Sequence, residues 1–294
     1  MAEQDSGIER ISPRSAHIGG GISVDRVLPV RQRRRIGAWC FLDHAGPARF
    51  EPGGGMLVEA HPHIGLQTFT WLIEGEALHR DSLGNEQVLR PGQVNLMTAG
   101  IGISHTEESL PDQRVLHAAQ LWIALPPGKQ EIPPAFDHYP DLPRWTESGV
   151  AFTLLAGSYA GRSAPARVYS PLVGVDLQNA AAVSLRLALE PGYEHGLMVL
   201  EGGLAVEDER FGPNELAYLP AGRADAGLAL DAGSRVLLIG GAPATDDVTI
   251  WWNFVGSKEA IAQARQDWEN RSDRFGSVQG YENRRLTAPP VPWK

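Results

Sequence analysis

Two short pairs of metal-ligand residues mark the first half of the sequence. His61 and His63 have one residue between them, and so do His105 and Glu107. In a β-strand, residues i and i+2 point to the same face, so each pair can direct two side chains into one interior. Two neighbouring strands would thus supply four ligands to one divalent metal.

Three imidazole nitrogens and one carboxylate oxygen define the chemistry of this expected site. Such a donor set suits iron, manganese, cobalt, nickel, copper or zinc, and these residues alone do not choose among the six. A metal with positions open to water or substrate favours catalysis over a closed structural site. Either pair could arise by chance on an exposed strand, but the two share their spacing and lie among repeated β landmarks. We therefore predict one metal per chain.

Short apolar segments separated by turn signals indicate the elements that must position these ligands. The 33 glycines and 22 prolines are spread throughout the chain, as many short strands require. One clear helix is expected late in the sequence, where Ser257 can cap a run from residue 258 to 268. This run places Ile261, Ala264 and Trp268 on one side. The pattern predicts a mostly β protein with the helix packed against it.

Two landmarks recur in the second half of the chain. Residues 72–75 (LIEG) recur as 199–202 (VLEG), and residues 98–100 (TAG) recur as 220–222 (PAG). Self-similarity of this kind indicates a duplicated structural unit. The sequence therefore predicts two related β-barrels in tandem.

The proline-rich stretch from residue 126 to 143 is where regular structure is least able to continue. We place the linker between the barrels there. The predicted domains are an N-terminal metal-binding domain at residues 1–140 and a C-terminal domain without metal at residues 141–294. The second domain is expected to include the late helix and the tail.

The remaining histidines and the second copy give little sign of another site. Four residues of the second copy fall opposite His61, His63, His105 and Glu107 when the landmark offsets are applied, in this order: Ala188, Glu190, Gly227 and Ala229. Only Glu190 among these four could bind a metal. His195, the only histidine of the second copy, is expected to be structural or exposed, and His44 and His79 are interpreted as structural.

Net charge, cysteine content and the length of apolar runs limit the partners and the location that we expect for this protein. The formal net charge of -9 disfavours general binding to nucleic acid or anionic membranes. Cys40 is the only cysteine, so no intrachain disulfide is expected, and the start of the chain lacks the basic and apolar regions of a signal peptide. No apolar run reaches the roughly 18 residues of a spanning helix. We expect a cytoplasmic protein whose partners are small molecules or proteins.

Several motifs together resemble those of the pirin family. Gly55, followed after five residues by His61 and His63, is similar to the first cupin motif. The similarity continues through HPHIG at 61–65, LIEG at 72–75, DSLG at 81–84, MTAG at 97–100, GISHTE at 102–107 and LW at 121–122, with RVLP at 26–29 and FLDHAGP at 41–47 upstream. The resemblance is specific from Asp25 to Pro126 and loose in the C-terminal half.

This resemblance implies a fold and a site. It implies a bicupin of two jelly-roll-like β-barrels, with an Fe(II) site in the N-terminal barrel and a C-terminal cupin that has lost its metal. The implied ligands are the four residues already singled out by spacing: His61, His63, His105 and Glu107.

The resemblance also implies alternatives for function. Pirin-like proteins include quercetin 2,3-dioxygenases, which open the central ring of a flavonol with O2 and release carbon monoxide. We therefore expect a dioxygenase that takes a small planar aromatic substrate and O2, with Glu107 as the catalytic base. The alternative is a metal-dependent regulatory protein that docks a transcription factor or metabolic enzyme without turnover, using the basic cluster at residues 31–35. A metal-dependent isomerase or hydrolase is a third reading, for which the sequence offers no further acid/base residues.

Two residues beside the ligands depart from the family pattern. Ile64 stands where many relatives carry arginine, and Gln67 where they usually carry glutamate. At a pocket mouth, this exchange would favour a planar apolar substrate over an anion. A different substrate, lost activity, or a compensated surface pair without catalytic consequence are the other interpretations.

Overall fold

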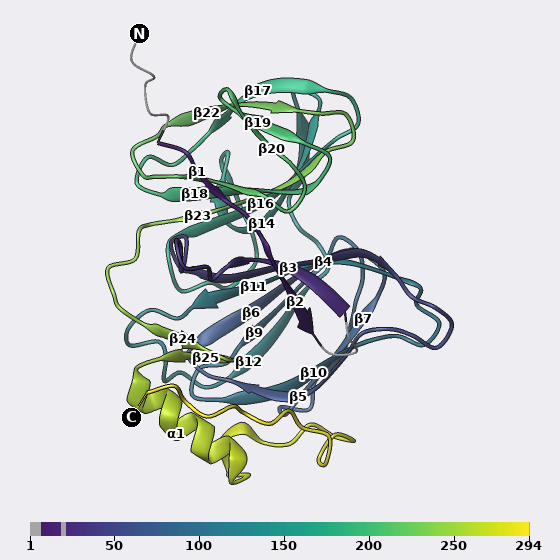
Figure 1. Cartoon of the computed structure of the whole chain (residues 1–294), viewed down its shortest axis with the longest axis vertical. Coiled ribbons are helices and arrows are strands. Elements are labelled where there is room, and N and C mark those ends of the chain that lie inside the picture. Colours follow the sequence, from purple (N-terminus) through teal and green to yellow (C-terminus); the bar gives the residue numbers. More distant parts are fainter. Residues whose placement is uncertain (1–6, 19–21, 294) are drawn as a thin grey trace. The chain divides into compact units, whose positions relative to one another are not determined.

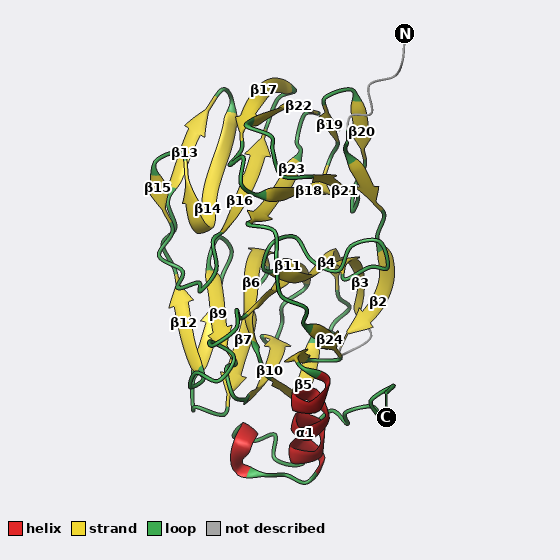
Figure 2. Ribbon diagram, turned by 90° about the vertical axis from the view of Figure 1, so that its left-hand side faces the viewer, coloured by secondary structure: helices red, strands yellow, loops and turns green. Residues whose placement is uncertain are grey.

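Most of the described chain forms β-strands. The computed structural model describes residues 7–18 and 22–293. It contains two cupin domains, and the described part has one α-helix, near the C-terminal end (Figures 1 and 2). The predicted all-β bicupin with a C-terminal helix is therefore confirmed. Within the described residues, no helix is long and apolar enough to cross a membrane.

The first barrel is built from two sheets. A seven-stranded sheet has the order β12-β9-β6-β11-β4-β3-β2, and a four-stranded sheet has the order β5-β10-β7-β8. The strands of these sheets are β2 (Arg14–Ile18), β3 (Ile22–Leu28), β4 (Trp39–Arg49), β5 (Leu57–His63), β6 (Leu66–Glu74), β7 (Ala77–Asp81), β8 (Glu86–Leu89), β9 (Val94–Thr98), β10 (Ile103–Ser109), β11 (Val115–Ala124) and β12 (Ala135–Tyr139).

The second barrel repeats this division into a large and a small sheet. The large sheet has the order β1-β21-β18-β23-β16-β14-β13, with β15 paired to β14, and the small sheet has the order β17-β22-β19-β20. The strands of these sheets are β1 (Glu9–Ile11), β13 (Arg144–Glu147), β14 (Val150–Tyr159), β15 (Arg162–Ser163), β16 (Leu172–Asn179), β17 (Val183–Ala188), β18 (Glu194–Glu201), β19 (Leu204–Val206), β20 (Glu209–Phe211), β21 (Leu216–Leu219), β22 (Asp225–Leu230) and β23 (Arg235–Gly241).

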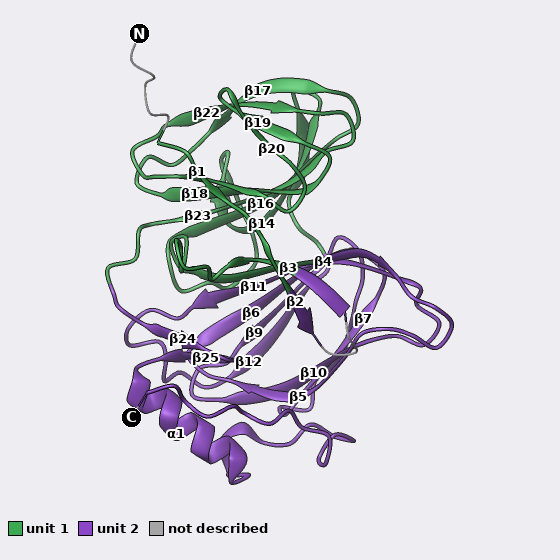
Figure 3. Ribbon diagram, in the orientation of Figure 1, with its two compact units in different colours: residues 1–15, 25–44, 141–245 green, residues 16–24, 45–140, 246–294 purple. Residues whose placement is uncertain are grey.

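The chain forms two compact units, coloured separately in Figure 3, and neither unit is continuous in sequence. One unit comprises residues 1–15, 25–44 and 141–245, and the other comprises residues 16–24, 45–140 and 246–294. These units depart from the predicted domains 1–140 and 141–294, although both divisions place a boundary between residues 140 and 141. Residues 25–44 group with the second barrel because their side chains bond there: the Trp39 indole, for example, donates to the carbonyls of Val173 and Gly240.

The repeated landmarks mark equivalent strand ends. β6 ends at Glu74 and is followed by Gly75 at φ 91°, and β18 ends at Glu201 and is followed by Gly202 at φ 74°. A Cβ atom at Gly75 would lie 2.3 Å from the Val115 carbonyl oxygen. Glycine is therefore required by both backbone conformation and space at this turn.

The C-terminal helix follows the sequence prediction closely. α1 (Lys258–Glu269) begins after Ser257, whose hydroxyl accepts a hydrogen bond from the Ala260 N–H at 3.1 Å. Its buried residues are the three predicted from spacing: Ile261, Ala264 and Trp268. They pack against a cluster that includes Ile64 and Phe254. Phe254 belongs to a short hairpin of β24 (Thr249–Trp251) and β25 (Phe254–Gly256), and a 3-10 turn, η2 (Asp273–Phe275), follows the helix.

The core of the second barrel is apolar. Leu187, Leu197 and Leu228 belong to its buried cluster, and burial of such side chains stabilises a fold without offering metal ligands. His195 on β18 is buried too, and this burial lowers its pKa to about 4. The imidazole therefore remains neutral at physiological pH.

Candidate metal centre

Two neighbouring strands bring the predicted histidines together. β5 and β10 pair in antiparallel fashion, and the register places His105 directly opposite His61. His63 lies two residues further along β5 and therefore points to the same face. All three side chains are buried, with at most 6% of any residue exposed. The expectation that adjacent strands carry the two ligand pairs is met for these histidines.

The three imidazole rings converge on one point. One nitrogen from each of His61, His63 and His105 lies within 4.8 Å of the others. Nε2 of His63 is 3.1 Å from Nε2 of His105. Two nitrogens bound at right angles to a metal, each at about 2.1 Å, would be about 3 Å apart. The triad could therefore hold a metal ion without a large rearrangement.

Main-chain acceptors fix the outward nitrogens of two of these histidines. Nδ1 of His61 lies 2.8 Å from the Glu59 carbonyl oxygen, and Nδ1 of His63 lies 3.0 Å from the Asn253 carbonyl oxygen in the β24–β25 hairpin. A carbonyl oxygen only accepts, so each Nδ1 carries the hydrogen. Each Nε2 then presents a lone pair to the centre, as metal binding requires.

Burial keeps these three histidines in the neutral form. It lowers the pKa of His61 to about 4 and is the main cause that holds the pKa values of His63 and His105 well below 6.5. Coulombic interactions with neighbouring histidines lower the last two further. Neutral imidazole is the form that binds metal, so the site is prepared for a cation at physiological pH.

Glu107 lies beside the triad but outside the group of converging atoms. The β5–β10 register shifts between His105 and Glu107, so Glu107 faces Val58. The Thr70 hydroxyl lies 3.5 Å from the Glu107 carboxylate and 2.9 Å from the Gln120 amide oxygen, and burial raises the pKa of Glu107. The structure therefore brings three of the four predicted ligands together, and ligation by Glu107 stays a prediction.

A small cavity adjoins Glu107. Its volume is about 50 Å³, and it is lined mainly by apolar residues with a few polar groups, among them Thr70, His79, Asn95 and Gln120. Sites for drug-sized ligands have volumes of roughly 300–1,000 Å³. The cavity as it stands admits only very small molecules, and a larger substrate requires its walls to move.

His79 on β7 contacts His105, and this contact was not predicted from the sequence. Its Nδ1 lies 3.3 Å from Nδ1 of His105, and its ring stacks on Phe136 with centroids 4.3 Å apart. From the sequence, His79 is interpreted as structural, although its spacing to Asp81 indicates otherwise. His79 and Asp81 have the same i, i+2 spacing as the two ligand pairs, and β7 pairs with β10 on the side away from β5.

Comparison with known proteins agrees with the motifs. The sequence matches the Pirin family over residues 21–123 and the pirin C-terminal cupin domain over residues 174–276. The chain belongs to the pirin family.

Similar pirins and pirin-type structures extend over nearly the whole chain. A Pseudomonas aeruginosa protein named "Putative quercetin 2,3-dioxygenase" is 65% identical, covering 98% of this chain and 91% of its own. A pirin-like protein of Caulobacter vibrioides is 39% identical, covering 85% of this chain and 89% of its own. The crystal structure of quercetin 2,3-dioxygenase from Acinetobacter baumannii has 47% identity and a TM-score of 0.96, covering 99% of this chain and 97% of that one.

The two departures from the usual pirin pattern are not a surface pair. Ile64 is 3% exposed and packs with Phe254 and Trp268 in the cluster beneath α1. Gln67 is fully buried, and its side-chain amide donates to the Thr98 hydroxyl at 2.9 Å. Neither residue lines the cavity beside Glu107. The interpretation of an exposed compensated pair is therefore wrong, and Ile64 instead anchors the C-terminal helix of this pirin.

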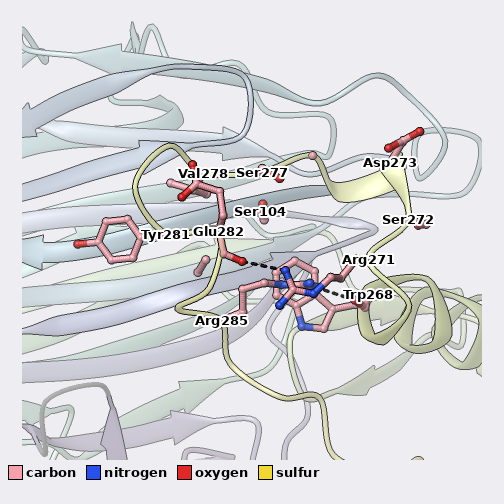
Figure 4. A pocket seen from close by; sticks show the side chains of 12 residues that line it. Ser104, Trp268, Arg271, Ser272, Asp273, Ser277, Val278, Tyr281, Glu282 and Arg285 are labelled. Atoms are coloured by element: carbon pink, nitrogen blue, oxygen red, sulfur yellow. Dashed lines mark hydrogen bonds between the residues drawn. The ribbon is translucent and has the colours of Figure 1, made fainter.

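A second cavity of this pirin, of about 360 Å³, is lined by Ala60, Ser104 and the segment after α1 (Figure 4). Its Arg271 donates to the Glu282 carbonyl at 3.0 Å, and its Arg285 donates to the Trp268 carbonyl at 2.6 Å. The Arg285 guanidinium also lies over the Trp268 ring, 3.5 Å from its centroid. These contacts hold the C-terminal segment together. Ala60 and Ser104 alternate with His61 and His105 along β5 and β10, so this cavity lies on the opposite face of the sheet from the three histidines.

Proposed function

We propose that this protein is a metal-dependent dioxygenase that acts on a flavonol such as quercetin or on a related aromatic enol. The observation that carries the proposal is the buried triad of neutral histidines beside the Glu107 carboxylate. The names of its similar relatives support the same substrate class. We place the protein in the cytoplasm, where cell fractionation should recover it.

His61, His63 and His105 would hold one divalent metal, with Glu107 as a fourth ligand or a near neighbour. Fe(II) is our first choice, and manganese, cobalt, nickel, copper and zinc suit the same donors. When bound, the metal would supply Lewis acidity and bring O2 and substrate together. The three histidines maintain geometry, and their burial excludes bulk water from the reacting groups.

Glu107 is the residue that we assign to proton transfer. Its raised pKa makes it a better proton acceptor than an exposed glutamate. It would accept the proton of the substrate hydroxyl. Because the adjoining cavity has only about 50 Å³, a flavonol has to widen it on entry, and smaller enols belong in the same test.

The test is turnover under air and under nitrogen, using protein loaded separately with iron and with each other metal and assayed for bound metal. Quercetin and smaller enols are offered as substrates. Oxygen-dependent loss of substrate with release of carbon monoxide is the expected result. One metal bound per chain without turnover of any enol would contradict the enzyme and favour the regulatory binding protein, which should then retain a protein partner only when metal is bound.

Replacement of Glu107 by glutamine separates proton transfer from metal binding. We expect turnover to fall by roughly 10²-fold or more, the usual contribution of a positioned base, while bound metal falls much less. Glu108→Gln is the matched control, because Glu108 instead bonds Arg80 and the Tyr281 hydroxyl. Unchanged turnover in a metal-loaded Glu107→Gln protein would remove Glu107 from this role.

A further inference from the structure

Two buried polar residues, His79 and Asp81, follow His105 on the side away from the point where the three histidines converge. We call this series of contacts the relay. His105 Nδ1 faces His79 Nδ1 at 3.3 Å, and His79 Nε2 faces Asp81 Oδ2 at 3.1 Å. Both residues come from β7, and neither is more than 5% exposed. This arrangement differs from that of His61 and His63, whose outward nitrogens meet main-chain carbonyls.

Along the relay, the donor or acceptor role of each atom fixes the role of the next. The Asp81 carboxylate only accepts, so His79 Nε2 carries a hydrogen and donates it. In a neutral imidazole the other nitrogen is then an acceptor. His79 Nδ1 therefore accepts from His105 Nδ1, and His105 Nε2 is left with the lone pair that a metal needs.

We propose that His79 and Asp81 are positioning residues that hold His105 in its metal-binding tautomer. In effect they replace the main-chain carbonyl that serves the other two ligands. Stacking of His79 on Phe136 fixes the plane of the relay. The proposal rests on the metal centre proposed above, and it holds whichever substrate that centre serves.

Asp81 also has a structural role, which the test must separate. Its Oδ1 accepts from the main-chain N–H groups of Leu83 at 2.9 Å and Asn85 at 3.1 Å, and so shapes the β7–β8 turn. Its Oδ2 is the oxygen that faces His79. Oδ2 also accepts from the Asn85 side-chain amide at 2.9 Å. The two main-chain bonds of the turn thus fall on Oδ1, and the bond to His79 falls on Oδ2.

Asp81→Asn exploits this division. The main-chain N–H groups of the turn require an oxygen, so the new amide oxygen stays with them and the NH2 group faces His79. The Asn85 amide loses its bond to Oδ2 and keeps the one to Oδ1. His79 must then accept at Nε2 and carry its hydrogen on Nδ1, opposite the hydrogen of His105. His105 relieves this conflict by moving its hydrogen to Nε2, which blocks the metal lone pair. The replacement of a triad aspartate by asparagine in serine proteases acts through the same change of tautomer.

The measurement is the dissociation constant for Co(II) or Zn(II), obtained by competition with a chromogenic chelator. We expect Asp81→Asn to weaken binding roughly 10–100-fold, the usual effect of losing an outer hydrogen-bond partner of a ligand. The visible spectrum of the Co(II)-loaded variant should change as well. The melting temperature of the metal-free protein should stay close to that of the wild type, because the turn is kept.

Two further variants make the test independent of folding effects. Asn85→Ala removes the side-chain bonds from Asn85 to Asp81 but leaves the relay, and should bind metal like the wild type. His79→Phe removes the relay but can keep the stack on Phe136, and should weaken binding as Asp81→Asn does. In the His79→Phe background, Asp81→Asn should then have no further effect.

The outcomes separate the two proposals. If the wild type binds metal no better than a His61→Ala variant, the metal centre itself is wrong. If the wild type binds metal and Asp81→Asn binds it equally well, or if the two substitutions act additively, the relay is wrong and the centre stands.

Discussion

Replacement of His63 by alanine is expected to abolish specific metal binding. His63 provides one of three converging nitrogens, and its Nε2 lies 3.1 Å from that of His105. Loss of a ligand should exceed the roughly 100-fold upper effect of losing an outer partner. Metal at 100 times its dissociation constant stabilises the wild type by about 2.7 kcal/mol. This stabilisation, measured as a shift in melting temperature with and without metal, should be absent from the variant together with oxygen-dependent turnover.

His17→Ala is the control for this experiment, since His17 is exposed on β2 and takes no part in the triad. It should bind metal and show the same shift in melting temperature as the wild type. A His63→Ala protein that keeps one metal per chain with wild-type affinity would contradict the site.

Replacement of Trp39 by alanine is expected to destabilise the metal-free protein by about 3–5 kcal/mol, as for other buried tryptophans. Trp39 is 1% exposed, and its indole Nε1 lies 3.2 Å from the carbonyl oxygens of both Val173 and Gly240, to which its N–H donates. Its ring also lies against Gly174, where a Cβ atom would approach it to 3.3 Å. The alanine variant therefore loses apolar contacts, leaves a cavity and removes a donor from buried carbonyls. Urea unfolding followed by circular dichroism measures the loss.

Trp145→Ala is the matched comparison in the same compact unit. Trp145 is only partly buried, although it stacks on Phe152, and its buried indole nitrogen has no hydrogen-bond partner among the described residues. Its replacement should cost less than that of Trp39. A loss below about 1 kcal/mol at Trp39 would mean that the residues from 25 to 44 contribute little to the stability of this unit.

The convergence of the three histidines was predictable because strand periodicity is a local property. His61 and His63 share a face whatever else the chain does, and the repeated glycine landmarks predicted the barrels that carry them. The position of Glu107 was less predictable from the same rule. The register shift after His105 depends on how β10 meets β5, which the spacing of two residues does not encode.

The parts that sequence reasoning missed depend on contacts between distant segments. The proline-rich stretch expected to be only a linker includes β12, which pairs with β9. In the second barrel, landmark offsets placed Gly227 and Ala188 at positions equivalent to the facing pair His105 and His61. The structure pairs Gly227 with Arg186 instead. Loops differ in length between the two copies, and each difference adds an error to a fixed offset. Strand register in the second barrel therefore cannot be derived from the first by counting residues.

The hydrogen bond from His63 to the Asn253 carbonyl spans 190 positions of the chain, so its two partners are synthesised at different times. At about 5–20 residues per second, synthesis of residue 253 follows that of residue 63 by roughly 10–40 s. All three histidines have left the ribosome long before the acceptor for His63 is made. A nascent chain thus carries the three histidines before the residue that orients His63 is made. The proposed metal centre is complete only after residues 141–245 and the hairpin that follows them have been translated.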